Sequence, residues 1–124
     1  GKLGDVKQHW PTLEETVATL RESNAWVSLA HPSHYDFTRS KRRKLVADFL
    51  QAGGHAIEVV NGLQPAEQVG TLAILPREFG LLVTAGSDFH APGGWAEIGI
   101  YRPVPEDLPP LWARFKHDQP TAAV

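Results

Sequence analysis

Three short apolar runs, separated by stretches long enough to form helices, set the main constraint on how this chain folds. The runs cover residues 26–30, 56–60 and 81–85. Alternation of helix and strand is typical of a parallel sheet covered by helices. Strands that are buried on both faces read as continuous apolar runs, as these do. The sequence therefore predicts an α/β fold built on parallel strands.

Capping residues and periodicity place the helices between these runs. Thr12 and Glu15 match a capping box, in which Thr12 caps a helix and Glu15 reaches back to the cap. Pro76 lacks a backbone N–H and should break or kink its helix into two short pieces. The expected helices cover residues 13–24, 39–51, 65–79 in two pieces, and 108–115, and a short fourth strand is expected over residues 98–101.

Composition bounds the class of protein. The 124 residues suffice for one domain, and the apolar share of 42% is ordinary for a globular protein. The absence of cysteine excludes disulfides and thiolate metal sites, and the net charge of -2 argues against a broad nucleic-acid-binding face. Without a long apolar run or a signal-like N-terminus, we expect a cytoplasmic protein with no membrane partner.

Two features suggest that the chain is part of a longer protein. It contains no methionine and begins with Gly1, and three or four strands amount to only half of a barrel. We therefore expect residues 1–116 to be the C-terminal part of a domain whose N-terminal part is missing, followed by a flexible tail over residues 117–124. Because half a barrel leaves strand edges without partners, it should self-associate or sit beside the missing half of its own protein.

Metal-binding side chains follow two of the apolar runs. His31 comes directly after the first run, and the third runs into Gly-Ser-Asp-Phe-His at residues 86–90. In α/β barrels the carboxyl ends of the strands carry the chemistry. On extended backbone Asp88 and His90 point the same way, and a carboxylate beside an imidazole suits Zn, Mn or Fe(II). These residues are candidate metal ligands, although each strand end also fits a polar loop whose side chains are hydrogen-bonded.

Glu58 and a basic run are less specific signals. Glu58 lies mid-strand, where a carboxylate is costly unless paired, so it either orients a ligand histidine or makes a structural hydrogen bond. The basic residues between Arg39 and Lys44 begin a helix, and helix N-termini and arginine both favour phosphate. The alternative is a solvated helix face. Arg39, nearest the helix start, is the best phosphate-binding candidate.

The chain resembles the C-terminal half of a PHP (polymerase and histidinol phosphatase) domain. The strings that carry the resemblance are Leu-Ala-His-Pro at residues 29–32, Ile-Glu-Val at 57–59 and Thr-Ala-Gly-Ser-Asp-Phe-His at 84–90. The most similar branch includes bacterial 5′-to-3′ exoribonucleases and nucleoside 3′,5′-bisphosphate phosphatases. The resemblance, from about Trp10 to Trp112, implies the C-terminal half of a distorted (β/α)7 barrel. It also implies two or three divalent metal ions (Mn, Fe or Zn) at the carboxyl ends of the strands.

The resemblance also implies roles for individual residues. His31, Asp88 and His90 correspond to the metal ligands that this half supplies. The other ligands, among them a His-x-His pair that this chain lacks, belong to the N-terminal half. Where the branch usually has His-Pro-Gly-Arg-Tyr, residues 31–35 read His-Pro-Ser-His-Tyr. His34 thus replaces a permanent charge, but it can still donate a hydrogen bond to a phosphate.

The implied activity is metal-dependent hydrolysis of small phosphorylated nucleotides or RNA 5′ ends, with this chain supplying only part of the active site. We expect the fragment alone to be inactive. Two alternatives stay open. One is a histidinol-phosphate phosphatase-like activity of the same domain type. The other, favoured by the missing His-x-His pair, is a non-catalytic half-domain that acts as an interaction module.

Overall fold

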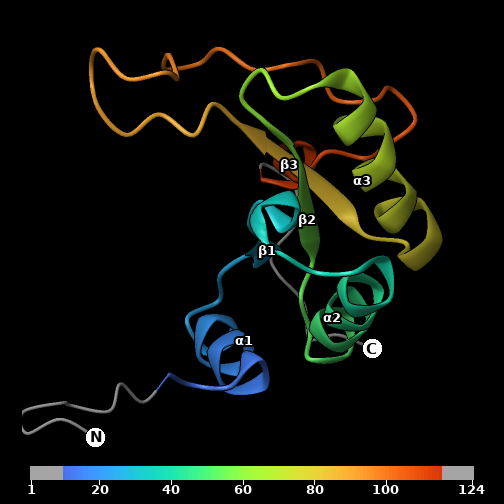
Figure 1. The fold of residues 1–124 in the computed structure, drawn as a ribbon. Helices are drawn as coiled ribbons and strands as arrows, with labels where there is room; N and C mark the ends of the chain where they lie inside the picture. Colours follow the sequence, from blue (N-terminus) through green and yellow to red (C-terminus); the bar gives the residue numbers. More distant parts are fainter. Residues whose placement is uncertain (1–9, 116–124) are drawn as a thin grey trace, which may run out of the picture.

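The computed structural model describes residues 10–115, which form a three-stranded sheet with helices packed against it (Figure 1). The fold is α/β with parallel strands, as the alternation of apolar runs and helical segments predicts. Along the chain the elements are α1 (Leu13–Glu22), β1 (Ser28–Leu29), the 3-10 helix η1 (Pro32–His34), α2 (Arg39–Gln51), β2 (Ala56–Asn61), α3 (Ala66–Phe79), β3 (Leu82–Gly86) and the 3-10 helix η2 (Leu111–Arg114).

The strand β2 is the centre of the sheet and pairs in parallel with β1 and with β3. Glu58 lies opposite Thr84, and a register shift between Glu58 and Val60 bends the strand near its carboxyl end. The strand β1 covers only part of the apolar run 26–30, and it ends at Leu29 because His31 has a φ of 26° and turns the chain away from the sheet. Because both pairings are parallel, all three strands end at the same edge of the sheet.

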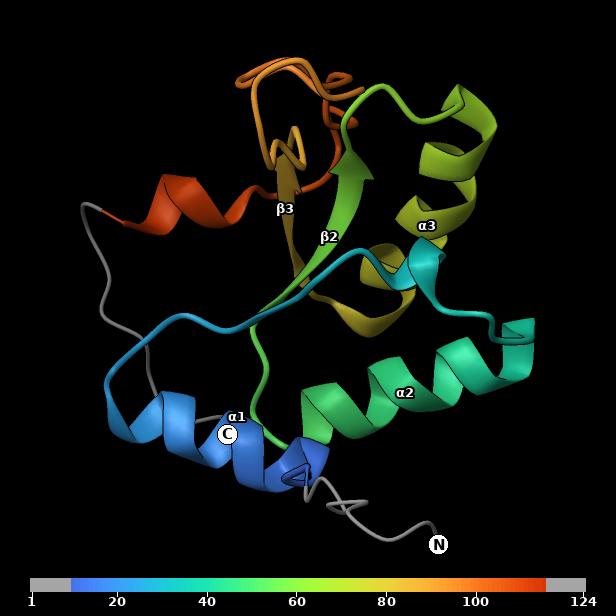
Figure 2. The same ribbon diagram turned by 60° about the vertical axis from the view of Figure 1, so that its left-hand side comes forward.

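The two faces of the sheet differ in polarity. Leu29, Ile57 and Val83 are buried on the face that packs against α2 and α3, which lie on one side of the sheet in both ribbon views (Figures 1 and 2). On the other face Ser28 and Thr84 are half-buried, and their hydroxyl oxygens lie 2.8 Å apart. Because parallel sheets are usually covered on both faces, the half-exposed polar face is the one that further strands of a barrel would enclose.

The first two helices follow the sequence signals closely. Thr12 Oγ1 accepts a hydrogen bond from the Glu15 N–H at 3.1 Å, as a capping residue should. The helix α1 ends at Glu22, two residues earlier than expected, because Asn24 adopts a φ of 59° that no helix contains. The bounds of α2 are those expected, and Thr38 caps it by accepting the Lys41 N–H at 3.2 Å.

The prediction that Pro76 divides its helix is wrong, because α3 is continuous from Ala66 to Phe79. Pro76 lies only three residues before the helix ends, so its ring interrupts one hydrogen bond near the end of the ladder rather than several in the middle. The side chain of Pro76 is fully buried in the core. Gly80, with a φ of 69°, ends the helix and donates its N–H to the Pro76 carbonyl.

Two predictions for the C-terminal region are also wrong. Residues 98–101 form a turn and irregular loop instead of a strand, because Gly99 has a φ of 76° and breaks the extended backbone. The expected helix over 108–115 is only the short η2, which starts after Pro110. The Pro109 carbonyl accepts the Val83 N–H at 3.0 Å and so covers part of the outer edge of β3. The tail predicted over residues 117–124 lies outside the described residues.

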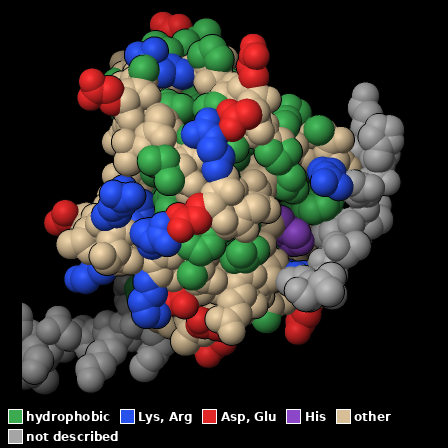
Figure 3. Space-filling view, turned by 90° about the vertical axis from the view of Figure 1, so that its right-hand side faces the viewer, with side chains coloured by type: hydrophobic (Ala, Val, Ile, Leu, Met, Phe, Trp, Pro, Cys, Tyr) green, Lys and Arg blue, Asp and Glu red, His purple; other side chains and the backbone are tan. Residues whose placement is uncertain are grey.

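The outer surface of α2 and α3 carries mixed charges (Figure 3). Arg43 forms a two-pronged ion pair with Glu78 that links the two helices, and its guanidinium lowers the pKa of the Glu78 carboxyl. Lys44 pairs with Asp48 at 2.8 Å. Arg43 and Lys44, at the end of the basic run, therefore lie on a solvated helix face and pair with carboxylates. Within residues 10–115 no helix is long and apolar enough to cross a bilayer.

We expect the isolated chain to self-associate in solution. Along its outer side β1 has no neighbouring strand among the described residues, and the face carrying Ser28 and Thr84 is only half-buried. Light scattering over a range of concentrations should therefore show species larger than a monomer. Ser28→Lys places a charge on this face and should reduce association, whereas Ser40→Lys on exposed α2 should not. A wild-type chain that stays monomeric at all concentrations would contradict the prediction.

Candidate functional site at the carboxyl ends of the strands

His31 is held in a strained conformation at the carboxyl end of β1. Its φ of 26° and ψ of 61° are rare for any residue other than glycine. The His31 N–H donates to Glu58 Oε1 at 2.9 Å, and the imidazole stacks on His34 with ring centroids 4.6 Å apart. The His31 Nδ1 atom is buried and has no hydrogen-bond partner within the described part of the chain. The neighbouring groups therefore fix this side chain but leave one ring nitrogen unused.

Asp88 and His90 lie side by side after β3, as predicted, but not on extended backbone. Asp88 has a φ of 58°, so the loop turns at this residue. His90 Nδ1 lies 2.7 Å from the Asp88 carbonyl oxygen and 3.8 Å from Asp88 Oδ1. The Asp88 side chain is 20% exposed, and the His90 side chain is 78% exposed. The turn therefore brings the pair together and presents the imidazole to solvent.

Glu58 links the ends of β1 and β2. Its Oε1 atom accepts both the His31 N–H and, at 3.2 Å, the side-chain N–H of Asn61. Nearby Tyr35 has a raised pKa, chiefly because of burial and then because of the negative charge of Glu58. The sequence leaves two roles open for Glu58: orienting the ring of a ligand histidine, or making a structural hydrogen bond. The structure shows the second, because Glu58 accepts the backbone N–H of His31 rather than a ring N–H. Glu58 therefore positions the residue and stabilises the turn.

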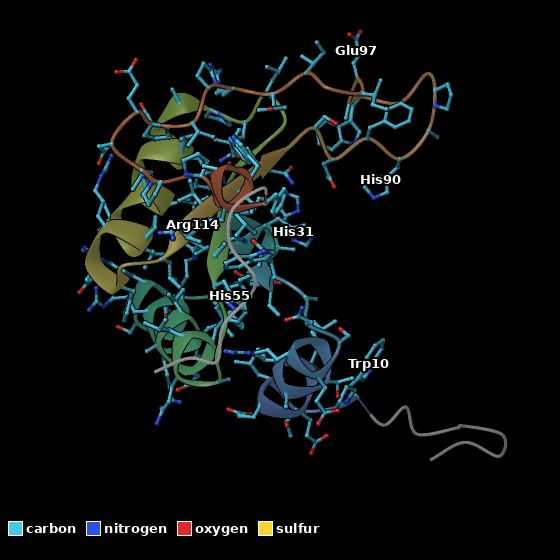
Figure 4. The ribbon with its side chains drawn as sticks, turned by 180° about the vertical axis from the view of Figure 1, so that it is seen from behind. Trp10, His31, His55, His90, Glu97 and Arg114 are labelled. Atoms are coloured by element: carbon cyan, nitrogen blue, oxygen red, sulfur yellow. The ribbon has the colours of Figure 1, made fainter. Side chains whose placement is uncertain are left out.

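The three candidate ligands do not form a ready-made metal site. Within residues 10–115 no group of three histidine, cysteine, aspartate or glutamate side chains lies close enough to hold an ion. Figure 4 shows His31 next to the sheet and His90 farther out on the loop, both on the same side of the molecule. The structure thus brings Asp88 and His90 together, and His31 does not complete a group of three with them.

The two candidate phosphate-binding residues line different pockets. His34 lines a pocket of about 370 Å³ at the carboxyl ends of β2 and β3. Arg39 lines a second pocket of about 300 Å³ between α2 and α3, together with Arg42 and Arg43. Only His34 is adjacent to the candidate metal ligands, through its stacking on His31.

Sequence reasoning gave no functional role to the Asn-Gly pair that ends β2 or to the loop above it. Asn61 is the one polar or charged side chain that is buried within the described region, and it ends β2 next to Gly62. The signal was available, because Asn-Gly follows the second apolar run as His-Pro follows the first. Trp95, which lines the 370 Å³ pocket, carries no local signal, since only the folding of the loop brings it to β2.

Comparisons with known proteins found relatives among bacterial enzymes, although no family model matches the chain. The chain is 35% identical over 117 residues to a 3′,5′-nucleoside bisphosphate phosphatase of Chromobacterium violaceum, covering 94% of this chain and 41% of the relative. It is 33% identical over 121 residues to the 5′-3′ exoribonuclease Rnm of Escherichia coli, covering 98% of this chain and 41% of that enzyme. The chain thus spans about two fifths of the length of these curated relatives.

Two solved structures have a similar fold. An amidohydrolase from Chromobacterium violaceum with bound sulfate gives a TM-score of 0.79 at 34% identity, over 91% of this chain and 39% of that one. A Bifidobacterium adolescentis protein described as a metal-dependent phosphoesterase gives a TM-score of 0.61 at 24% identity, over 85% and 35%. The second match supports the fold alone.

Removing the Glu58 carboxylate should destabilise the chain. Glu58→Ala leaves the His31 N–H and the Asn61 side chain without their acceptor, which should lower the free energy of unfolding by about 1–3 kcal/mol. Glu58→Gln keeps one acceptor oxygen and should lower the free energy of unfolding by less. Urea unfolding measures both, with Glu67→Ala on exposed α3 as the control. Equal stability of Glu58→Ala and Glu67→Ala would show that the link is unimportant.

Proposed function

We propose that the chain is part of a PHP-type phosphoesterase and that the complete protein hydrolyses phosphate esters of small nucleotides or RNA 5′ ends with divalent metal ions. One observation carries the proposal. Candidate metal ligands follow β1 and β3, the two parallel strands on either side of β2, beside a pocket, in a chain one third identical to enzymes named for nucleotide and RNA hydrolysis. Residues 1–116 are then the C-terminal part of the domain.

The residues fit a metal ion. A buried imidazole nitrogen without a hydrogen-bond partner is costly, and a bound cation would remove that cost at His31 Nδ1. The carboxylate of Asp88 beside the imidazole of His90 adds ligands that suit Mn, Fe or Zn. His31, Asp88 and His90 would hold metal. When bound, the ions would neutralise charge on a phosphate and acidify a water molecule.

Backbone strain supports the same assignment. Three non-glycine residues in the described part of the chain have a positive φ, and two of them are His31 and Asp88. Such conformations cost on the order of 1–3 kcal/mol each and persist only where the surroundings enforce them. For His31 the enforcing contact is the hydrogen bond to Glu58. Strain at both strand ends, and at the residues predicted to bind metal, favours a pre-organised site.

The other roles belong to the residues around the ligands. His34 stacks on His31 and can donate a hydrogen bond to a phosphate that lies beside the candidate metal ligands. Arg39 supplies a permanent charge, but at a pocket in the helical layer. The remaining ligands would come from the part of the relatives that this chain does not cover, so the chain alone should hydrolyse phosphate esters poorly or not at all.

A non-catalytic half-domain is the second candidate function. It is favoured by the absence of a three-ligand group within residues 10–115. On this reading the half-exposed polar face of the sheet binds a partner segment and the strand ends carry no chemistry. Metal content and hydrolysis by the complete protein separate the two functions, and assays with histidinol phosphate test the other PHP-type activity.

In the complete protein, Asp88→Ala, His90→Ala and His31→Ala should each lower turnover by orders of magnitude and reduce bound metal. Each substitution removes one ligand from the set that holds the ions. Metal analysis and hydrolysis of a nucleoside 3′,5′-bisphosphate measure the two effects. Arg39→Ala should chiefly raise KM, and Lys41→Ala on the exposed face of α2 serves as the control.

Two results would contradict the proposal. If Asp88→Ala keeps full metal content and full activity, the assignment of the metal site is wrong. A complete wild-type protein without metal-dependent hydrolysis of any phosphorylated nucleotide would remove the function and leave the half-domain as the better account.

A further inference from the structure

The pocket of about 370 Å³ adjoins both strand ends that carry candidate metal ligands. Ser87, which lines it, directly precedes Asp88, and the ring of His34, another lining residue, stacks on His31. Ligand pockets span roughly 300–1,000 Å³, so this one is at the small end of the range. Its size suits a single ring system rather than a polymer segment.

Trp95 provides a large aromatic surface at this pocket. The residue is 76% exposed, although it is one of the largest apolar side chains of the chain. A methyl group at Gly62 would lie 3.7 Å from Trp95 Cζ3 and 3.2 Å from the Ser87 carbonyl oxygen. The indole therefore packs against a backbone that has no side chain, while most of its area stays accessible.

The support beneath Trp95 is rigid. Gly62 has a φ of 60°, its N–H donates to the Gly86 carbonyl at 2.7 Å, and its own carbonyl accepts the Arg102 N–H at 3.0 Å. These bonds tie the end of β2 to β3 and to the returning loop. An aromatic side chain that is supported on one side and accessible elsewhere can stack with a ligand at little cost in conformational entropy.

Further apolar side chains surround the same pocket. Leu63 is 63% exposed and Ile100 is 46% exposed, and both line it together with Trp95. Apolar groups that remain exposed around a pocket usually mark a binding site. Glu97 also lines this pocket, but its side chain lies well away from His31 and His90 in Figure 4, so the acidic group is at the far end of the pocket from the candidate metal ligands.

We propose that this pocket binds the nucleobase of a nucleotide, with Trp95 as the stacking surface. The phosphate then lies toward Asp88 and His31, an orientation that rests on the phosphoesterase function proposed above. Stacking of a base on an aromatic ring is tolerant of base identity. The pocket therefore selects nucleotides over phosphate esters without a base, and it does so whichever base is present.

Binding to the chain itself tests the pocket, because all of its lining residues lie in this chain. Adenosine 5′-monophosphate should bind more tightly than ribose 5-phosphate, as measured by calorimetry. Trp95→Ala should lower the affinity for adenosine 5′-monophosphate about 10- to 100-fold, the usual loss when a stacking residue is truncated. The affinity for ribose 5-phosphate should not change. Trp95→Phe keeps an aromatic ring and should retain most of the affinity. Trp10→Ala, at an 81% exposed residue before α1, is the matched control.

Adenosine, which has no phosphate, separates this inference from the proposed function. If adenosine binds and Trp95→Ala abolishes its binding, the base pocket stands even if the complete protein hydrolyses nothing. Three results would overturn it: equal affinities for adenosine 5′-monophosphate and ribose 5-phosphate, wild-type nucleotide affinity in Trp95→Ala, or no binding of adenosine and its monophosphate at millimolar concentration. Metal-dependent hydrolysis could survive any of these results, because it depends on His31, Asp88 and His90.

Discussion

The parallel pairing of β2 with both of its neighbours is the constraint on which the rest of the structure depends. Because all three strands run the same way, their carboxyl ends meet at one edge, and the residues that follow them become neighbours there. Glu58 on β2 then reaches the backbone of His31, and Gly62 bonds to Gly86 of β3. The helices α2 and α3 support this arrangement by burying the apolar face of the sheet. A slip of one residue in register would move Glu58 to the other face and separate it from His31.

The same pairing leaves the other face of the sheet incompletely covered. Ser28, Glu58 and Thr84 are half-buried there, in a class of sheet that is normally covered on both sides. The relatives are longer, and this chain spans about two fifths of their length. A polar, partly exposed face beside strained strand ends is what half of a barrel should present. The strained backbone of His31 is held by its hydrogen bond to Glu58, which lies within this chain.

Much of the fold could be predicted because the relevant signals are local. The bounds of α2 and the cap of α1 follow from residues within a turn of the helix end, and β2 and β3 follow from apolar runs. The errors arose where tertiary packing or the backbone conformation of a single residue overrides the preference of the segment. Pro76 stays in a continuous helix with its ring buried in the core, and residues 98–101 form no strand because the positive φ of Gly99 outweighs the strand preference of its apolar neighbours. At the candidate site, spacing alone suggests that Asp88 and His90 lie side by side, but it does not predict the left-handed backbone of Asp88 that brings them together.

The sequence by itself determined the class of fold, the polar residues at the end of each strand and the family resemblance, because each of these depends on residues close together in the chain. Only the tertiary structure decided which side chains share a space. Parallel pairing of β1 with β2 brings His31 to Glu58, which is 27 residues later in the chain. The packing of α2 on α3 places Arg39 at a different pocket from His34. The returning loop carried Trp95 to the backbone of Gly62. Such contacts depend on register and on loop geometry, which arise from packing the whole chain and leave no periodic trace in the sequence.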